Sequence, residues 1–235
     1  MENIDLSKVL FLDIETVPGA PDYQSLSPEF QVLWDEKTAW QRQEGETPEE
    51  FYPKRAGILA EFGKIICISV AYFSAPRQLR VKSFFGEDEK DILTRFSTLL
   101  NQYFNQKDHL LCAHNGKEFD FPYLCRRMLI HRLPLPDILQ IQGKKPWEIG
   151  HLDTMELWKF GDRKNFTSLK LLAALFGIPT PKEDMDGSMV GPVFWKEKDL
   201  ERIARYCEKD TITLAQLLLA FRAEPILEES EITIT

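Results

Sequence analysis

The chain has 235 residues, of which 43% are hydrophobic and 28% charged, and its formal net charge is −8. This composition is that of an ordinary globular protein and excludes disorder over most of the length. No apolar run reaches the ~18 residues that a membrane-spanning helix needs, and the acidic N-terminus does not resemble a signal peptide, so we expect a cytoplasmic protein.

The negative charge is concentrated toward the ends of the sequence. Residues 1–61 hold 13 acidic and 5 basic side chains, whereas residues 62–223 carry a net charge of +4. Basic residues gather at 126–132, 143–145 and 159–164. The charge distribution therefore permits the central part of the chain to bind a polyanion, although the net charge alone argues against it.

The first half of the chain is rich in predicted strands. A continuous apolar run predicts a strand over 8–14, and apolar or alternating patterns predict two more over 64–73 and 78–85, joined as a hairpin. Residues 19–61 interrupt this pattern and form an insertion. Apolar residues at helical spacing predict an amphipathic helix over 89–104.

The second half alternates strands with helices. We expect a short buried strand, then a helix, then a strand or strand-like turn, then two helices, at 109–114, 119–132, 151–157, 168–177 and 199–221. An antiparallel meander followed by βαβ crossovers predicts an α/β fold, with a mixed five-stranded sheet flanked by helices and a helical insertion after the first strand. A single domain over 1–223 is expected, followed by an acidic C-terminal tail, 224–235.

Cysteines and histidines do not form a recognisable metal site. The four cysteines lie in apolar stretches without a CxxC pair, so we expect reduced core thiols. The four histidines lack HExxH spacing, which argues against a zinc hydrolase, and no glycine-rich phosphate loop occurs.

Two carboxylates lie at the end of the first predicted strand. Strand alternation places Asp13 and Glu15 on one face, with Leu12 and Ile14 on the other. Buried like charges are costly, so this pair predicts either a solvated strand end or a site that holds a cation.

Three further candidates come from two other segments. Asp120 lies where a buried strand gives way to a helix, and Tyr206 and Asp210 are one helical turn apart. Alone, each has a simple structural interpretation, as a helix cap or as a hydrogen-bonded Tyr–Asp pair. Together, hard oxygen ligands from three segments suit Mg²⁺ or Mn²⁺, and carboxylates that bridge two such ions serve displacement at phosphorus.

The motifs that contain these residues resemble a known family. DIET (13–16), HNGKEFD (114–120) and YCEKD (206–210) are similar to the three motifs of the DEDD 3′–5′ exonucleases, which have an RNase H-like fold. Tyr206 indicates the DEDDy branch, since Arg205 stands where the DEDDh branch has histidine. Flanking sequences most resemble the predicted exonucleases related to the proofreading domain of family B DNA polymerases.

The resemblance implies roles for the five residues. It implies that Asp13, Glu15 and Asp210 bind a first divalent cation, Mg²⁺ or Mn²⁺. Asp13 and Asp120 would serve a second, and Tyr206 would orient the attacking water.

The resemblance also implies substrate contacts by Thr16, Asn115 and Phe119, although each has a structural alternative as a turn or core residue. His151 and Asp153 lie on the return strand near the expected site, where a structural role is favoured over a direct one.

The implied activity is release of nucleoside monophosphates from single-stranded or frayed 3′ ends, with DNA as the expected substrate and DNA repair as the expected context. Two alternatives remain: an inactive nucleic-acid-binding or scaffold module, and an exoribonuclease or oligoribonuclease. No motif encodes contacts to the 2′-hydroxyl that would distinguish RNA from DNA.

The insertion offers two interpretations. Phe30, Leu33 and Trp34 lie at helical spacing, and Trp40 follows within two turns. They predict either simple packing on the domain or an acidic wall that repels long polyanions and admits only a frayed 3′ end.

Overall fold

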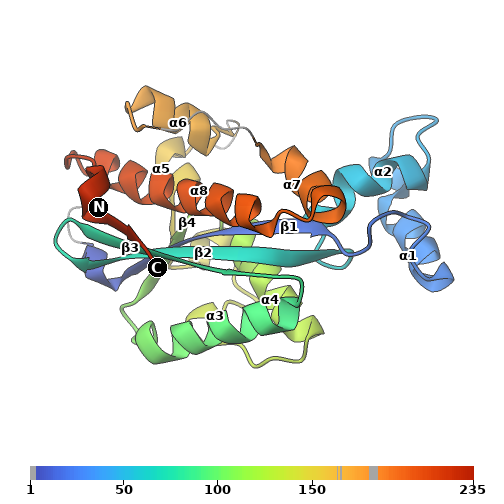
Figure 1. Cartoon of the computed structure of the whole chain (residues 1–235), viewed down its shortest axis with the longest axis horizontal. Coiled ribbons are helices and arrows are strands. Elements are labelled where there is room, and N and C mark those ends of the chain that lie inside the picture. Colours follow the sequence, from blue (N-terminus) through green and yellow to red (C-terminus); the bar gives the residue numbers. More distant parts are fainter. Residues whose placement is uncertain (1–3, 163, 165, 180–184) are drawn as a thin grey trace.

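The computed structural model describes residues 4–162, 164, 166–179 and 185–235. Within these residues it forms a six-stranded mixed sheet in the order β5-β4-β1-β2-β3-β6, with helices on both faces (Figure 1). The strands are β1 (Val9–Pro18), β2 (Gly63–Ala75), β3 (Gln78–Phe85), β4 (Leu110–Ala113), β5 (Leu152–Asp153) and β6 (Ile232–Ile234).

The helices of the described residues vary widely in length. They are α1 (Pro28–Thr38), α2 (Pro48–Arg55), α3 (Glu89–Tyr103), α4 (Asp120–Ile130), α5 (Thr154–Lys159), α6 (Leu169–Leu175), α7 (Val190–Pro192) and α8 (Leu200–Phe221). Short helical turns are η1 (Leu6–Lys8), η2 (Ala39–Gln41), η3 (Ala56–Ile58), η4 (Asp137–Leu139), η5 (Pro146–Glu148), η6 (Gly187–Met189), η7 (Val193–Glu197) and η8 (Glu229–Glu231). None of the helices in the described ranges combines the length and apolarity needed to cross a bilayer.

The predicted topology is confirmed. β1, β2 and β3 form an antiparallel meander, and β4 and β5 add in parallel on the other side of β1. The α/β class and the helices expected near 89–104, 119–132, 168–177 and 199–221 are also present.

Two expectations need correction. The strand expected over 151–157 is only two residues long, because the Asp153 carboxylate accepts hydrogen bonds from the backbone N–H groups of Met155 and Glu156 and starts helix α5. The sheet has six strands among the described residues rather than five. Within the segment expected as an acidic tail, Ile232 and Ile234 alternate with threonines, and β6 pairs in parallel with β3.

The sheet separates two apolar layers. Leu10, Leu12 and Ile14 of β1 point into the layer that contains α3 and α4. Val9 and Phe11 point the other way and pack against α8. This strict alternation along β1 also determines which face receives its polar residues.

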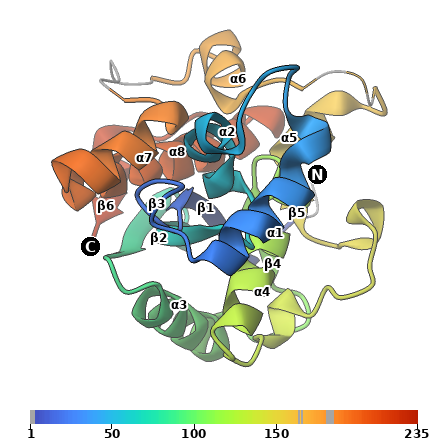
Figure 2. The same cartoon turned by 90° about the vertical axis from the view of Figure 1, so that its right-hand side faces the viewer.

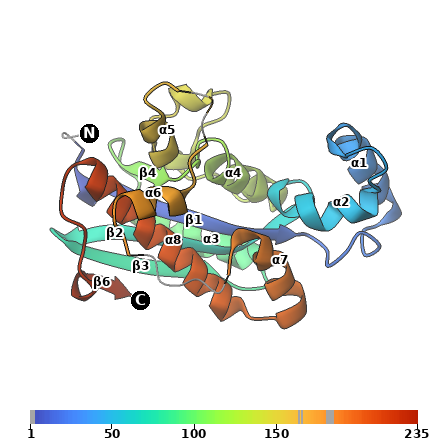
Figure 3. The same ribbon diagram turned by 90° about the horizontal axis from the view of Figure 1, so that it is seen from above.

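The insertion folds on its own small core beyond the end of β1 (Figure 3). Trp34 of α1 and Tyr52 of α2 are fully buried and pack with Phe62, just before β2. The two ends of the insertion meet, because the Gly19 N–H donates to the Phe62 carbonyl at 2.7 Å. Figure 2 looks onto α1 and α2 from this end. The packing interpretation therefore accounts for Trp34, whereas Trp40 is 82% exposed.

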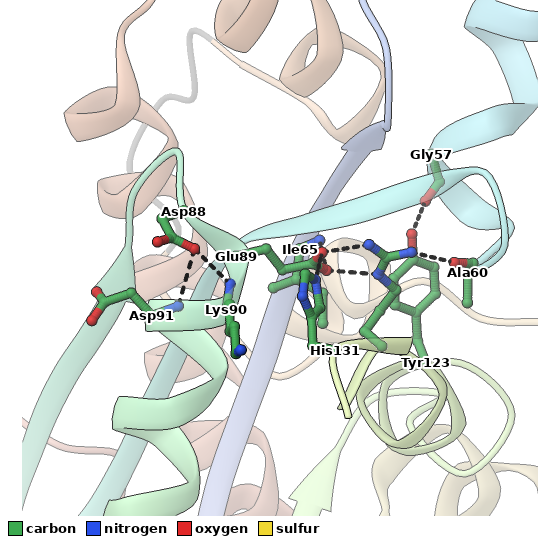
Figure 4. A network of polar contacts seen from close by, with 10 residues as sticks. Gly57, Ala60, Ile65, Asp88, Glu89, Lys90, Asp91, Tyr123 and His131 are labelled. Carbon is green, nitrogen blue, oxygen red and sulfur yellow. Dashed lines mark hydrogen bonds and ion pairs between the residues drawn. The ribbon is translucent and has the colours of Figure 1, made fainter. Parts of the chain in front are cut away.

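A buried ionic network lies where the insertion returns to the sheet (Figure 4). The Glu89 carboxylate, at the start of α3, accepts hydrogen bonds from the Ile65 N–H at 2.7 Å and from Arg127 Nε at 2.8 Å. His131 Nε2 lies 2.7 Å from the second oxygen, which also accepts from Arg127 Nη2. Although burial acts to raise the pKa of Glu89, the hydrogen bonds from Arg127 and Ile65 lower it below its usual value.

Helix α4 holds the end of the insertion through the same region. Arg127 Nη1 donates to the Ala60 carbonyl and the Tyr123 hydroxyl donates to the Gly57 carbonyl, both at 2.8 Å. A Cβ on Gly63 would lie 2.2 Å from the Tyr123 hydroxyl, so only glycine fits at the first residue of β2. These contacts fix α4 relative to the start of β2.

Candidate active site

Strand β1 delivers two acids to the face covered by α8. Asp13 and Glu15 follow the alternation of Val9 and Phe11, as the sequence predicts, and Glu15 is only 8% exposed. The pairing of β1 with β2 shifts register between Glu15 and Thr16. Such a bulge redirects the strand directly after the two acids.

Asp120 enters from the opposite side of the sheet. The pairing of β1 with β4 ends at Phe11 and Cys112, so beyond it β1 has no partner strand on its β4 side, and Asp120, the first residue of α4, lies close to the backbone of Ile14. Burial, with repulsion from Asp153, raises the pKa of Asp120 to about 7. The short length of β4 thus lets a helix terminus bring its acid beside β1.

Helix α8 supplies Tyr206 and Asp210. The two side chains lie one helical turn apart on α8, close enough for the Asp210 charge to act on the phenol. Burial and then the charge of Asp210 raise the pKa of Tyr206 far above its usual value. The phenol is therefore protonated at neutral pH and acts as a hydrogen-bond donor.

The carboxylates from the three elements repel one another. Burial, followed by the charges of Asp120 and Asp210, raises the pKa of Asp13 well above its ordinary value. Burial, followed by the charge of Asp13, raises the pKa of Glu15 in the same way. The structure thus brings Asp120 and Asp210 close enough to Asp13 and Glu15 for their charges to raise the pKa of both, which is the arrangement a divalent cation would neutralise.

Cys207 is the contact that sequence reasoning missed. Its thiol lies 3.4 Å from both the backbone oxygen and a carboxylate oxygen of Asp13. The possible ligand atoms of Asp13, Glu15 and Cys207 all lie within 4.8 Å of one another. Its position directly after Tyr206 is the only available signal, because a lone buried cysteine is usually an inert core residue.

The three substrate-contact candidates are distributed around these acids. Thr16 lies close to the Tyr123 hydroxyl, and the Phe119 ring centroid lies 5.3 Å from that of Tyr123, so both contribute to packing on the α4 side. Asn115 has a left-handed backbone (φ 63°), and its N–H donates to the Asp153 carboxylate at 2.9 Å.

A cavity of about 320 Å³ opens beside Asn115. It is also lined by Lys117, Trp147, Asp153 and Phe166. Trp147 is 61% and Phe166 68% exposed, so their rings are accessible from solvent.

Asp153 and His151 make structural contacts, the role that the sequence analysis favours for them. Asp153 is 4% exposed and accepts the Asn115 and Lys117 N–H groups, which holds the loop between β4 and α4. The ring of His151 lies between the Leu111 N–H and the Ile138 carbonyl.

Comparison with known proteins identifies the family. The family of predicted 3′–5′ exonucleases related to the exonuclease domain of PolB matches residues 58–224. That range is well over half of the chain and contains Asp120, Tyr206 and Asp210, while Asp13 and Glu15 lie before it. No curated protein matches the sequence.

Comparison with solved structures identifies the fold. The chain is similar to the family B DNA polymerase from the hyperthermophilic archaeon Pyrobaculum calidifontis, with a TM-score of 0.52 and 19% identity. The match covers 91% of this chain and 24% of the polymerase. The mixed sheet flanked by helices is thus the RNase H-like fold of a polymerase exonuclease domain. With residues 58–224 matched, the chain belongs to the family of predicted 3′–5′ exonucleases related to the exonuclease domain of PolB.

Proposed function

We propose that residues 1–223 form a two-metal-ion 3′–5′ exonuclease of the DEDDy type, which releases nucleoside monophosphates from single-stranded or frayed 3′ ends. The observation that carries this proposal is the group of four carboxylates from β1, α4 and α8, in which burial and the charges of the other acids raise the pKa of Asp13 and Glu15. A fold gains nothing from such a cluster unless a cation is to be bound.

The donor set fits Mg²⁺ or Mn²⁺. Carboxylate oxygens are the preferred ligands of both ions, and the Cys207 thiol adds a softer donor that Mn²⁺ tolerates better than Mg²⁺. Asp13, Glu15 and Asp210 would hold one ion, and Asp13 with Asp120 the other. When bound, such a pair lowers the pKa of a water and stabilises charge on the leaving 3′ oxygen.

Tyr206 has the orienting role in this scheme. Its position one helical turn before Asp210 places the phenol beside the ligands, and its raised pKa keeps the proton on the hydroxyl. The hydroxyl would then position the attacking water for in-line displacement.

The substrate follows from the surroundings of the acids. Thr16, Asn115 and Phe119 would position the terminal nucleotide, and the exposed rings of Trp147 and Phe166 offer stacking surfaces for unpaired bases. We take DNA as the substrate, with RNA as the alternative that the test decides.

The test is nucleotide release from a 5′-labelled single strand. With Mg²⁺ or Mn²⁺ the wild-type chain should shorten the strand stepwise from its 3′ end, and EDTA should stop it. Matched DNA and RNA strands decide the sugar preference, and Asp210→Asn controls for contaminating nucleases. Binding of the strand without any metal-dependent release would instead establish a binding module.

A further inference from the structure

Two lysines converge on one pair of aromatic rings near the candidate active site. Lys64 Nζ lies 4.5 Å from the ring centroid of Phe194 and 4.8 Å from that of Trp195. Lys198 Nζ lies 5.5 and 5.0 Å from the same two centroids. Because both ammonium groups contact the same rings, two positive charges occupy one small region.

Neither lysine has an acidic partner in contact. Among the described residues, no carboxylate oxygen lies within 4.0 Å of Lys64 Nζ or Lys198 Nζ, whereas other lysines such as Lys8 and Lys117 are paired. Burial lowers the pKa of Lys64; the charges of Glu89 and Glu87 oppose this, and the smaller effect of Lys198 adds to it. The rings attract the ammonium groups without neutralising them, so both charges stay available to an anion.

The pair lies at the same end of the sheet as the acids. Lys64 is paired with Val17, two residues beyond Glu15 on β1. The Trp195 indole N–H donates to the Pro18 carbonyl at 3.1 Å, which ties the aromatic pair to the end of that strand. Phe194 also packs with Val17 and Cys207 in one buried cluster.

The backbone that presents these residues is irregular. Residues Val193–Glu197 form a π-helical turn, which ends at Lys198 in a left-handed conformation (φ 59°). A π-helical turn and a left-handed conformation at a residue other than glycine each cost free energy, and both are often retained at functional sites. Here they bring Lys198 back over the ring that Lys64 contacts.

We infer that Lys64 and Lys198, supported by Phe194 and Trp195, form a binding subsite for a backbone phosphate of the nucleic-acid strand, next to the phosphate that is cleaved. The inference rests on the proposed function and adds to it the cationic contact that the acids lack. An acidic centre in a chain of net charge −8 repels a polyanion, so cations beside the centre are needed to hold the strand.

The test is strand binding without catalysis. The affinity of the full chain for a fluorescein-labelled single-stranded oligothymidylate is measured by anisotropy, in EDTA and over a salt series. Lys64→Gln and Lys198→Gln should each weaken binding about tenfold at low salt, the effect of losing one charge-assisted contact. Each should also reduce the slope of log affinity against log salt by about 0.7. Lys64→Arg, which keeps the charge, should retain most of the affinity.

Lys82→Gln is the matched control. Lys82 also lies over an aromatic ring, 5.3 Å from the centroid of Phe84, but that ring packs in the layer of α3 on the opposite face of the sheet. An unchanged slope in both Lys64→Gln and Lys198→Gln, or an equal loss in Lys82→Gln, overturns the inference. Since binding is measured in EDTA, this outcome differs from failure of the proposed function, which is absence of metal-dependent release by the wild-type chain.

Discussion

The acids of the candidate active site and the buried acid Glu89 differ in their electrostatic environment. At the candidate active site four carboxylates lie close together, and burial, followed by the charges of the neighbouring acids, raises the pKa of Asp13 and Glu15. In the network of Figure 4, Glu89 is 5% exposed, as little as Glu15 and Asp120, but it accepts hydrogen bonds from Arg127 and Ile65, and its pKa is lowered. Burial alone therefore does not mark a functional acid. The mark of a functional acid is a set of neighbours that does not compensate its charge.

The largest expected effect comes from removing a site acid. Asp13→Asn or Asp210→Asn should abolish nucleotide release, because each removes a charged ligand. The metal-free protein should lose no stability and is expected to gain some, since one repelling charge is gone. Thermal unfolding with and without Mn²⁺ measures this, and the stabilisation by Mn²⁺ should shrink in both variants. Full activity in either variant contradicts the site.

Tyr206→Phe keeps the ring and removes only the hydroxyl. We expect turnover to fall by about 10²–10⁴, the range for one positioned proton-transfer or orienting group, with metal affinity nearly unchanged. Turnover and Mn²⁺ titrations on the same preparation separate the two effects. Loss of metal binding together with activity would show that Tyr206 holds the site together instead.

Glu89→Ala removes an acid that is paired, in contrast to the site acids, which repel one another. It leaves Arg127 buried without its partner, and breaking a buried pair in this way costs about 3–5 kcal/mol of unfolding free energy. Urea unfolding should show this loss, while the folded fraction retains metal-dependent activity. Asp91→Ala, which removes an exposed ion pair on the same helix, is the control. A smaller loss of unfolding free energy in Glu89→Ala than in this control would contradict the difference between Glu89 and the site acids.

The contributions of Asp120 and Glu89 to stability should change with pH in opposite directions. The unfolded chain releases the Asp120 proton near 3.8 and the folded chain near 7, so the metal-free protein should lose stability as pH rises between these values. Glu89 has a lowered pKa, so its contribution is present above its ordinary value of 4.5 and is lost as pH falls through the folded value. Unfolding in EDTA from pH 5 to 8 should show a smaller decline in Asp120→Asn than in the wild type. Equal declines would contradict the raised pKa.

The smallest and most selective effect concerns the insertion. Replacing residues 22–55 by a short Gly/Ser linker leaves Gly57 and Ala60, where Tyr123 and Arg127 are anchored. If the acidic segment is a wall, rates should rise on duplex and long strands more than on short single strands, with a changed salt dependence. After circular dichroism confirms folding, an equal change on every substrate would leave the segment as packing support.

The sequence predicts what depends on local pattern. Strand alternation put Asp13 and Glu15 on one face, and helical spacing paired Tyr206 with Asp210, because both follow from backbone geometry alone. The basic group at 126–132 was counted as available to a polyanion, yet Arg127 is buried against Glu89, 38 residues away. Pairing over that distance depends on how α3 and α4 pack, which no local pattern records. The contact of Cys207 with Asp13 and the meeting of Lys64 with Lys198 were missed for the same reason.

The meeting of Gly19 with Phe62 has a consequence for how such a protein can change. Since the Gly19 N–H binds the Phe62 carbonyl, and Pro18 pairs with Gly63, the sheet is closed before the intervening segment begins. The entropy of closing a loop grows only slowly with its length, so segments of other sizes can be accommodated between the same two residues. This junction is therefore a position at which segments can be exchanged. Related chains could carry a different segment there without a change in the strands that hold Asp13 and Glu15.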